Sequence, residues 1–390
     1  MRAAILPAVD GALTVRDVPR PEPKGGEVLV EVAACGVCHT DLHVIRGEVA
    51  FPTPCVLGHE ITGRVAQLGD GVGGGSAGVG GDGAGSDTGG GAGHGLEIGT
   101  PVVCGFIMPC GTCRHCVRGW DDLCETFFTY NRLAGTLYDG TSRLVDDDGS
   151  SLAMYSMAGL AEYAVVPATD VFPLPDSIDL HDAAILGCSV FTSYGAVKNV
   201  ARVVPSDTVA VVAVGGIGLN IVQVAAAFGA RTIIAVDLSE EKLALAKELG
   251  ATHTVNAGDT DAVAAVRDLT GGRGVDVAFE ALGSAPTVET AIGAVDDGGR
   301  VVLVGIAPAG VSAKLDIAHV VRRKISVMGS YGARTRTDMP DLLALVEAGK
   351  IRLDRLITDR LTLDDVDDAY RRLGRREIVG RAVIELTPTP

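Results

Sequence analysis

The sequence is poor in the features that would direct a chain to a membrane, to a nucleic acid or out of the cell. Although 47% of its 390 residues are hydrophobic, no apolar run reaches the roughly 18 residues of a membrane helix. Lys and Arg number 33 against 49 Asp and Glu, and the net charge of −16 argues against a nucleic acid or an anionic membrane as partner. Residues 1–9 show no signal-peptide pattern and are typical of a short strand. We therefore expect a cytoplasmic protein with two domains, each large enough for its own core.

Cysteine is well represented, and four of the nine cysteines are closely spaced. They follow the pattern C-x2-C-x2-C-x7-C at Cys110, Cys113, Cys116 and Cys124. Four thiolates complete the tetrahedral shell that Zn²⁺ prefers and leave no position for a substrate. The spacing therefore predicts a structural zinc site in a reducing cytoplasm rather than a set of disulfides.

A second set of possible ligands is spread over three segments. Cys38 opens the stretch CHTD, His59 lies in GHE, and Cys188 lies in LGCS. Two cysteines and one histidine with a fourth, open position are typical of a catalytic zinc. A single cysteine in an apolar run is more often a packing residue, so this interpretation depends on what else the chain binds. The cysteines that lack such a context are expected to pack in the core: Cys35, Cys55 and Cys104.

A glycine turn between a strand and a helix indicates a dinucleotide site. A buried strand over residues 208–214 runs into Gly215-Gly216-Ile217-Gly218, a helix follows over 219–228, and a second strand over 232–236 ends in Asp237. The glycines let the backbone approach a pyrophosphate at the helix N-terminus, and a carboxylate about 20 residues further on binds the adenosine ribose. Ala213 stands where this fingerprint usually has its first glycine. Asp237 would repel a 2′-phosphate, and Leu238 has no group to bind one, which favours NAD over NADP.

The order and spacing of these motifs resemble the zinc-dependent medium-chain alcohol dehydrogenases over nearly the whole chain. The matching residues are 36–41, 58–60 with Gly63, the four-cysteine segment, 139–143, Cys188, the glycine turn, Asp237 and 380–381. Residues 124–163 are similar to the long-form branch, which includes dimeric alcohol and glutathione-dependent formaldehyde enzymes. The resemblance implies an α/β protein, with a doubly wound parallel Rossmann sheet joined to a mostly β, GroES-like catalytic domain.

The same resemblance divides the chain. Residues 1–188 and 330–390 would form the catalytic domain with both zinc sites, and residues 189–329 the NAD-binding domain. Strand and helix alternate in the latter, as in a parallel sheet covered on both faces. The further elements expected are helices over 240–249, 339–347 and 363–373, and strands over 275–279, 300–305 and 382–386. The glycine-rich insertion at 69–95, which contains His94, is expected to be a flexible surface loop without function.

The resemblance also assigns roles to single residues. Zinc at Cys38, His59 and Cys188 would make an alcohol oxygen acidic, and NAD would accept the hydride. Thr40 would hydrogen-bond the alcohol oxygen, and His43 would end a proton relay. Asp41 and Glu60 would orient or tune the zinc ligands. The expected cofactor contacts are His39 and Arg381 at the pyrophosphate, Thr192, Val304 and Ile306 around the nicotinamide, and Gly215, Gly216, Ile217, Gly218, Asp237 and Lys242 along the rest of the dinucleotide.

The expected substrate pocket is largely apolar, with Phe106, Met154 and Tyr155, and favours a primary or aromatic alcohol. A polyol dehydrogenase is one alternative. A glutathione-adduct enzyme is disfavoured, because the acid near Val49 and the arginine near Phe128 are missing. An alternative of another class is a non-catalytic nucleotide-binding protein, but such relatives usually lack both zinc clusters.

The resemblance further implies two zinc ions per subunit and a homodimer, with a homotetramer as the alternative. Apart from His94, four histidines have no assigned role. We expect an exposed position for His115 and ordinary surface or core positions for His181, His253 and His319.

Overall fold

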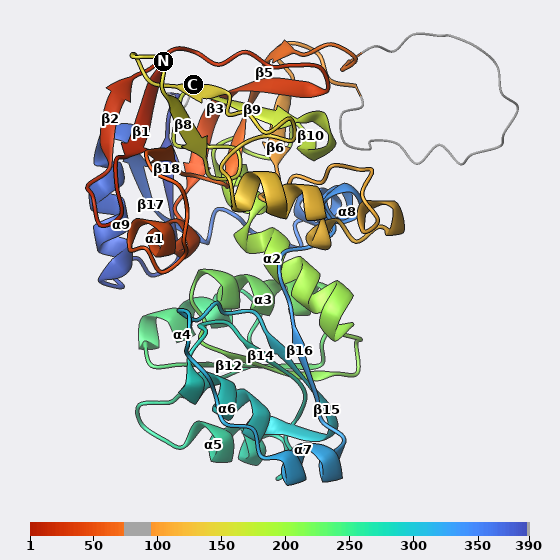
Figure 1. Cartoon of the computed structure of the whole chain (residues 1–390). Coiled ribbons are helices and arrows are strands. Elements are labelled where there is room, and N and C mark those ends of the chain that lie inside the picture. The colour runs from red at the N-terminus through yellow and green to blue at the C-terminus, as the bar shows by residue number, and fades with distance from the viewer. Residues whose placement is uncertain (74–94, 388–390) are drawn as a thin grey trace, which may run out of the picture.

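The computed structural model describes residues 1–73 and 95–387, so most of the glycine-rich insertion, with His94, lies outside the described residues. Figure 1 shows two domains, one above the other, with α2 (Ser189–Gly195) at the junction between them. No helix among the described residues is long and apolar enough to cross a membrane.

One half of the molecule is a parallel sheet of six strands in the order β13-β12-β11-β14-β15-β16. Every residue of β11 is buried, as expected for a strand with helices on both faces. The strands are β11 (Thr208–Val212), β12 (Thr232–Asp237), β13 (His253–Asn256), β14 (Val275–Glu280), β15 (Val295–Leu303) and β16 (Ser326–Gly329). The helices are α3 (Gly216–Ala227), α4 (Glu240–Glu248), α5 (Ala262–Leu269), α6 (Ala285–Ala294) and α7 (Ile317–Arg323). The strand order reverses between β11 and β14, and ligands of such sheets bind at the carboxyl ends of the strands at this point.

The other half contains two mostly antiparallel sheets, in the orders β2-β1-β4-β8-β7 and β10-β6-β5-β3-β18-β17, with β9 also paired to β3. The strands of the first sheet are β1 (Arg2–Leu6), β2 (Thr14–Asp17), β4 (Cys55–Val56), β7 (Leu144–Val145) and β8 (Ser151–Met154). Those of the second are β3 (Glu27–Gly36), β5 (Ile61–Leu68), β6 (Pro101–Cys104), β9 (Tyr163–Pro167), β10 (Val171–Pro173), β17 (Ile357–Thr362) and β18 (Arg381–Glu385). The helices are α1 (His39–Ile45), α8 (Thr335–Glu347) and α9 (Val366–Gly374). Since β18 pairs antiparallel with β3, the C-terminal segment completes a sheet built mainly from the N-terminal half of the chain.

Several element ends differ from those expected. α3 begins at Gly216 rather than at residue 219, because the glycine turn itself forms the first turn of the helix. β11 ends at Val212, and Ala213 then adopts a left-handed φ of 71°. That conformation costs an alanine about 1–2 kcal/mol. The backbone geometry that the fingerprint assigns to its first glycine is therefore kept here by a residue with a methyl group.

The remaining shifts are at segment ends. α8 begins at Thr335 rather than at residue 339, with Pro340 inside the helix. Residues 363–373 divide into a 3₁₀ turn, Leu363–Asp365, followed by α9. The strand expected over 300–305 spans Val295–Leu303, and the final strand begins one residue early, at Arg381. The pattern of apolar residues predicts where such elements lie but not where they begin and end, because capping and turn geometry determine the ends.

Candidate functional site

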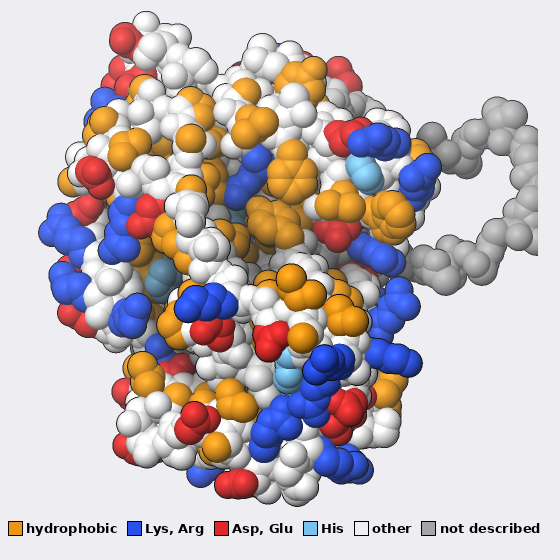
Figure 2. All heavy atoms as spheres, turned by 60° about the horizontal axis from the view of Figure 1, so that its bottom comes forward, with side chains coloured by type: hydrophobic (Ala, Val, Ile, Leu, Met, Phe, Trp, Pro, Cys, Tyr) orange, Lys and Arg blue, Asp and Glu red, His pale blue; other side chains and the backbone are white. Residues whose placement is uncertain are grey.

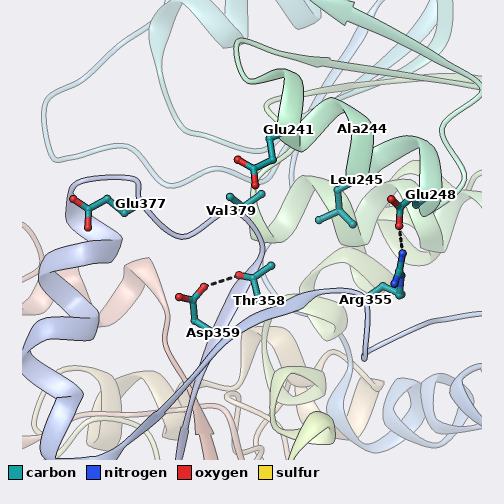
Figure 3. Close-up of a pocket in the computed structure, with 9 residues that line it drawn as sticks. All are labelled: Glu241, Ala244, Leu245, Glu248, Arg355, Thr358, Asp359, Glu377 and Val379. Carbon is teal, nitrogen blue, oxygen red and sulfur yellow. Dashed lines mark hydrogen bonds and ion pairs between the residues drawn. The ribbon is translucent and has the colours of Figure 1, made fainter.

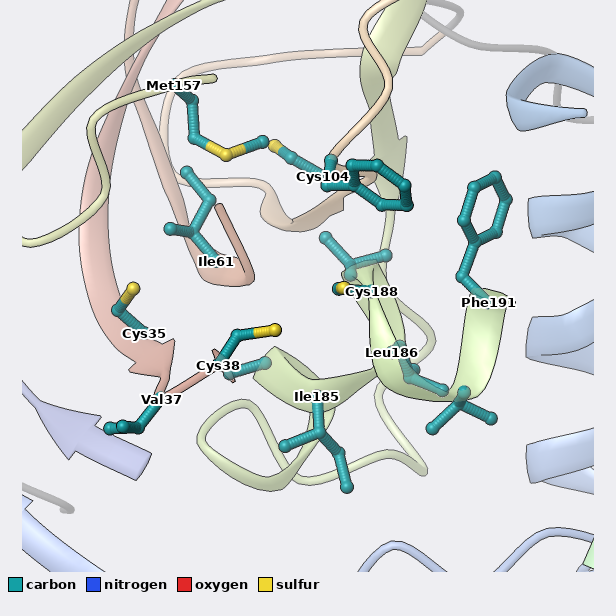
Figure 4. Close-up of a cluster of buried hydrophobic side chains, with 14 of the residues drawn as sticks. Cys35, Val37, Cys38, Ile61, Cys104, Met157, Ile185, Leu186, Cys188 and Phe191 are labelled. Atoms are coloured by element: carbon teal, nitrogen blue, oxygen red, sulfur yellow. The ribbon is translucent and has the colours of Figure 1, made fainter. Parts of the chain in front are cut away.

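Four side chains that could hold a metal ion converge between the two domains. The ligand atoms of Cys38, His59, Glu60 and Cys188 all lie within 4.8 Å of one another, and all four residues are buried. Cys38 caps the start of α1 after β3, whereas Cys188 caps the start of α2. Figure 4 shows the two sulfur atoms pointing toward each other from these separate elements. The fold thus assembles one site from three distant parts of the chain.

One nitrogen of His59 is left for a ligand. Its Nδ1 lies 3.0 Å from Asp41 Oδ1, and the other oxygen of Asp41 accepts a hydrogen bond of 2.8 Å from Tyr370 Oη. His59 Nε2 is buried and has no hydrogen-bond partner among the described residues. A carboxylate behind one ring nitrogen is the usual arrangement for a histidine whose other nitrogen binds a metal.

The two thiols respond to each other in the way expected of paired metal ligands. The hydrogen bond with Cys188 lowers the pKa of the Cys38 thiol, and the same contact raises the pKa of Cys188. The two sulfur atoms are therefore in direct contact, and a divalent cation binds thiols in their deprotonated form. Two sulfur ligands and an orphaned imidazole nitrogen fit zinc.

Glu60 connects this group to the nucleotide-binding turn. One of its oxygens accepts a hydrogen bond from Arg381 Nη2, and the other is buried without a partner among the described residues. Burial raises the pKa of Glu60 to about 7. Arg381 also lies against the glycine turn, because a Cβ at Gly216 would come within 2.8 Å of its Cδ. The metal-ligand group and the dinucleotide turn are therefore neighbours.

The turn residues lie at the sheet position where a dinucleotide binds. A Cβ at Gly218 would collide with the carbonyl oxygen of Ala213, so this position requires glycine. The carboxylate of Asp237, at the end of β12, accepts hydrogen bonds from the backbone N–H groups of Val214, Leu238 and Ser239. Lys242 follows in the first turn of α4, where its N–H contacts the capping hydroxyl of Ser239.

The other expected cofactor contacts surround the same cleft. Thr192 lies in α2 and donates its backbone N–H to the Cys188 carbonyl at 2.7 Å. Val304 follows β15, and its N–H bonds to the Glu280 carbonyl at the end of β14. Ile306 is 43% exposed, and His39 is exposed at the start of α1.

The four-cysteine segment forms a second, separate group. The sulfur atoms of Cys110, Cys113, Cys116 and Cys124 lie within 4.8 Å of one another, and none forms a disulfide. Backbone N–H groups point at the sulfurs, including Cys113 N–H to Cys110 Sγ at 3.3 Å and Phe127 N–H to Cys124 Sγ at 3.4 Å. Hydrogen bonds stabilise thiolates, and those that Cys110 accepts from the Thr126 side chain and from backbone N–H groups outweigh desolvation and lower its pKa to about 6. The donor set fits a zinc ion with a closed shell.

The residues without assigned roles also have defined positions. Cys35, Cys55 and Cys104 are fully buried, as expected for packing residues. His115 is not exposed as expected, since its side chain is only 19% accessible and stacks on Trp120. His181 is buried near the Thr387 carbonyl, His253 is exposed and His319 is half-buried.

An aromatic group extends from His59 toward the junction of the domains. The ring centroid of His59 lies 5.8 Å from that of Tyr155 and 6.0 Å from that of Phe106. Phe106 in turn lies 5.5 Å from Tyr331, and Tyr331 lies 5.9 Å from Phe128. We refer to Phe106, Phe128, Tyr155 and Tyr331 as the aromatic group. Tyr331 and Phe128 were missed in the sequence because no motif surrounds them.

Met154 does not join this group as expected. Its sulfur accepts a hydrogen bond of 3.2 Å from the backbone N–H of Arg143. Neighbouring residues in a strand point to opposite faces, so Met154 turns toward that loop while Tyr155, the next residue, faces His59. A second residue missed in the sequence is Arg132, whose Cζ lies 4.0 Å from the Tyr155 ring centroid.

A cavity of about 500 Å³ opens beside the aromatic group. Its walls include Phe128 and Tyr331 on one side and Val304 and Ile306 on the other. Figure 2 shows hydrophobic side chains gathered around the hollow between the domains. A separate hollow of about 320 Å³, between α4 and β17, contains none of the expected site residues; it is lined by several carboxylates, and one of them, Glu248, is paired with Arg355 (Figure 3).

Comparison with known proteins agrees with this architecture. Residues 24–176 match the alcohol dehydrogenase GroES-like domain, and residues 216–348 match the zinc-binding dehydrogenase family. The NDMA-dependent alcohol dehydrogenase of Amycolatopsis methanolica is 33% identical over 377 residues, which are 95% of each chain. An alcohol dehydrogenase of Geobacillus stearothermophilus is 32% identical over 99% of each chain. The crystal structure of benzyl alcohol dehydrogenase from Acinetobacter calcoaceticus superposes with a TM-score of 0.86, at 28% identity over 99% of each chain.

With a GroES-like domain, a Rossmann sheet and a cysteine- and histidine-rich site between them, the chain belongs to the zinc-dependent medium-chain alcohol dehydrogenases.

Proposed function

We propose that this enzyme oxidises a primary or aromatic alcohol reversibly and passes the hydride to NAD. In this proposal Cys38, His59 and Cys188 hold a catalytic zinc, and the four-cysteine group holds a structural one. The observation that carries it is the orphaned Nε2 of His59, which lies among two sulfur ligands, beside the aromatic group and next to the glycine turn. The name of the Acinetobacter enzyme, a benzyl alcohol dehydrogenase, supports the aromatic preference.

Zinc bound here would make the alcohol oxygen acidic, and NAD would accept the hydride from its carbon. Thr40 is suited to receive the hydroxyl proton, since its Oγ1 lies 3.5 Å from Cys38 Sγ. His43 lies one helical turn further along α1 and is 20% accessible, so it can pass the proton to water. Glu48 contacts Nδ1 of His43 and holds the ring in place. The aromatic group excludes water from the reacting carbon.

The first prediction concerns the reaction and its cofactor. With NAD and a panel of primary and aromatic alcohols, absorbance at 340 nm should rise, and NADP should be the poorer acceptor because Asp237 repels a 2′-phosphate. Asp237→Ser should reduce the preference for NAD over NADP. Asp259→Ser, at an exposed position after β13, should leave that preference unchanged.

Equal or better efficiency with NADP would reject the cofactor assignment. NDMA belongs in the panel because one relative is named for its dependence on it. Turnover with NDMA but none with added NAD would show that free NAD is not the acceptor. A non-catalytic nucleotide-binding protein would oxidise none of the alcohols.

The second prediction separates the two zinc sites. Cys188→Ser should abolish turnover with little loss of melting temperature, whereas Cys113→Ser should mainly lower stability, since structural zinc contributes directly to folding. Elemental analysis should give two zinc ions per parent chain and one for Cys188→Ser. Cys104→Ser is the matched control, a fully buried cysteine outside both groups, and should retain both ions. One zinc ion or none in the parent would contradict the assignment.

The third prediction tests the proton route. His43→Gln should slow alcohol oxidation roughly tenfold at pH 7, below the usual 10²–10⁴ for acid–base groups because water reaches the exposed end of the relay. Imidazole buffer or higher pH should restore much of the rate. Thr40→Ala should stay slow in every buffer, and His253→Gln, at an exposed position, should match the parent. Unchanged rates for His43→Gln, with hydride transfer limiting, would remove His43 from the route.

The fourth prediction concerns assembly, which we propose to be a homodimer. β16 lies at the edge of its sheet, and apolar side chains beside it are exposed, including Ile317 at 72% and Val321 at 68%. An unpaired edge strand with apolar neighbours favours pairing with a second copy. Light scattering should give twice the chain mass of 40.0 kDa. Val327→Lys on β16 should reduce the measured mass to that of a single chain, whereas Val9→Lys should leave it unchanged. A parent protein with the mass of one chain would disprove the dimer.

A further inference from the structure

We propose that Arg132 is a specificity-determining residue that binds a carboxylate on the substrate, so that the preferred alcohol carries a carboxylate at the end remote from its hydroxyl. This inference rests on the proposed alcohol oxidation and adds to it the class of substrate. It comes from an unpaired arginine in the wall of the aromatic group.

The guanidinium of Arg132 is held on one side only. Its Cζ lies 4.0 Å from the centroid of the Tyr155 ring, and its Nη2 donates a hydrogen bond of 3.3 Å to Tyr331 Oη. Nη1 is buried and has no partner, and no described carboxylate lies within ion-pair distance of this arginine. An arginine is always charged, and a buried charge without a counter-ion destabilises a protein. The arrangement is therefore one that an anionic ligand would complete.

The position of Arg132 relative to the metal ligands follows from Tyr155. The Tyr155 ring lies 5.8 Å from the His59 ring and 4.0 Å from Arg132 Cζ. Arg132 Cζ therefore lies no further from the centroid of the His59 ring than the sum of these two distances. A molecule of benzyl alcohol size, with its hydroxyl at the metal ligands, would direct its opposite end toward the guanidinium.

A second donor lies at the same place. The hydroxyl of Tyr155 is buried and has no hydrogen-bond partner among the described residues. Burial raises the pKa of Tyr155, so the hydroxyl keeps its proton and can donate it. A carboxylate accepts several hydrogen bonds at once, and the flat fork of an arginine suits it well. The guanidinium, with the Tyr155 hydroxyl beside it, matches that chemistry better than it matches an alkyl chain.

The backbone holds Arg132 rigidly in this position. Arg132 ends the π-helical turn Phe127–Arg132, and such turns often mark functional sites. The preceding residue, Asn131, donates from Nδ2 to the carbonyl oxygens of Met154 and Ser156, at 3.3 and 2.8 Å. These bonds fix the turn to the segment that carries Tyr155, so the two donors keep their relative geometry before a ligand arrives.

Asp122 is the carboxylate that lines the neighbouring cavity, and it would repel an anion if fully charged. It makes no ion pair with Arg132, and burial raises its pKa, which favours its neutral form. Asp122 therefore does not neutralise Arg132.

The test compares alcohols of matched shape. The parent enzyme should have a kcat/KM for 4-(hydroxymethyl)benzoate or its 3-isomer about 10- to 100-fold above that for 4-methylbenzyl alcohol, as expected for a charge-assisted hydrogen bond pair. Arg132→Leu should remove this preference, mainly by raising KM for the carboxylate substrates. Arg132→Lys should restore part of it, because the charge returns without the fork. Arg114→Leu, at an exposed arginine paired with Glu125, is the matched control and should behave as the parent.

Two results would overturn the proposal. The first is a parent enzyme without a preference for the carboxylate substrates. The second is an equal loss of kcat/KM on both kinds of substrate in Arg132→Leu and in a second variant, Arg132→Gln, which would indicate a structural role. Binding of terephthalate, followed by thermal shift of the zinc-loaded protein, separates this proposal from the proposed function. If no alcohol is oxidised, a terephthalate shift that Arg132→Leu abolishes still supports the carboxylate site, and the absence of a shift rejects it.

Discussion

The buried ion pair between Glu60 and Arg381 connects the parts of this enzyme that must work together. Glu60 belongs to the metal-ligand group, Arg381 begins the last strand, β18, and the arginine side chain packs on Gly216 in the other domain. Glu60 is fully buried and the Arg381 side chain is 7% accessible. Losing one partner of such a pair costs about 3–5 kcal/mol, because the other charge is left buried alone. The C-terminal strand, the metal site and the glycine turn therefore depend on one contact.

The same pair sets the charge balance of the metal site. Cys38, Cys188, Asp41 and Glu60 can each carry a negative charge within a short distance, against one arginine. The contact between the two sulfurs raises the pKa of Cys188, and burial raises the pKa of Glu60 to about 7. Asp41 and Cys38 raise the pKa of His59 against the opposing effect of burial. A dication is the natural counter-charge for this set of donors.

The sequence was most informative where the functional residues lie close together in short motifs. The four-cysteine spacing predicted a group that the structure brings together, and the turn ending at Gly218 with Asp237 after the next strand predicted the nucleotide fold. Cys188 has no spacing signal of its own and was proposed as the third ligand because a catalytic zinc needs one beside Cys38 and His59. Arg132 and Tyr331 could not be found in this way, because they meet through a π-helical turn and a segment almost 200 residues later. The sequence has no arginine at the position near Phe128. The π-helical turn nevertheless brings the guanidinium of Arg132 against Tyr331, whose ring contacts Phe128. For Met154, spacing gives the strand, but the alternation of side chains along the strand decides which of them faces the pocket.

The pocket that results has two polar ends separated by aromatic surface. At one end, His59 and the two cysteines hold the group that would bind the alcohol oxygen; at the other, Arg132 and the hydroxyl of Tyr155 have unpaired donors. An apolar pocket with one polar end fixes a substrate's depth but lets it rotate and slide, and discriminates weakly between alkyl chains of similar length. A second polar end removes that freedom, since a molecule of the wrong length leaves buried donors without partners. Tyr155 contacts both ends, so the distance between them is set by the width of one ring rather than by a flexible loop. The expected consequence is that the length of the substrate itself positions the reacting carbon.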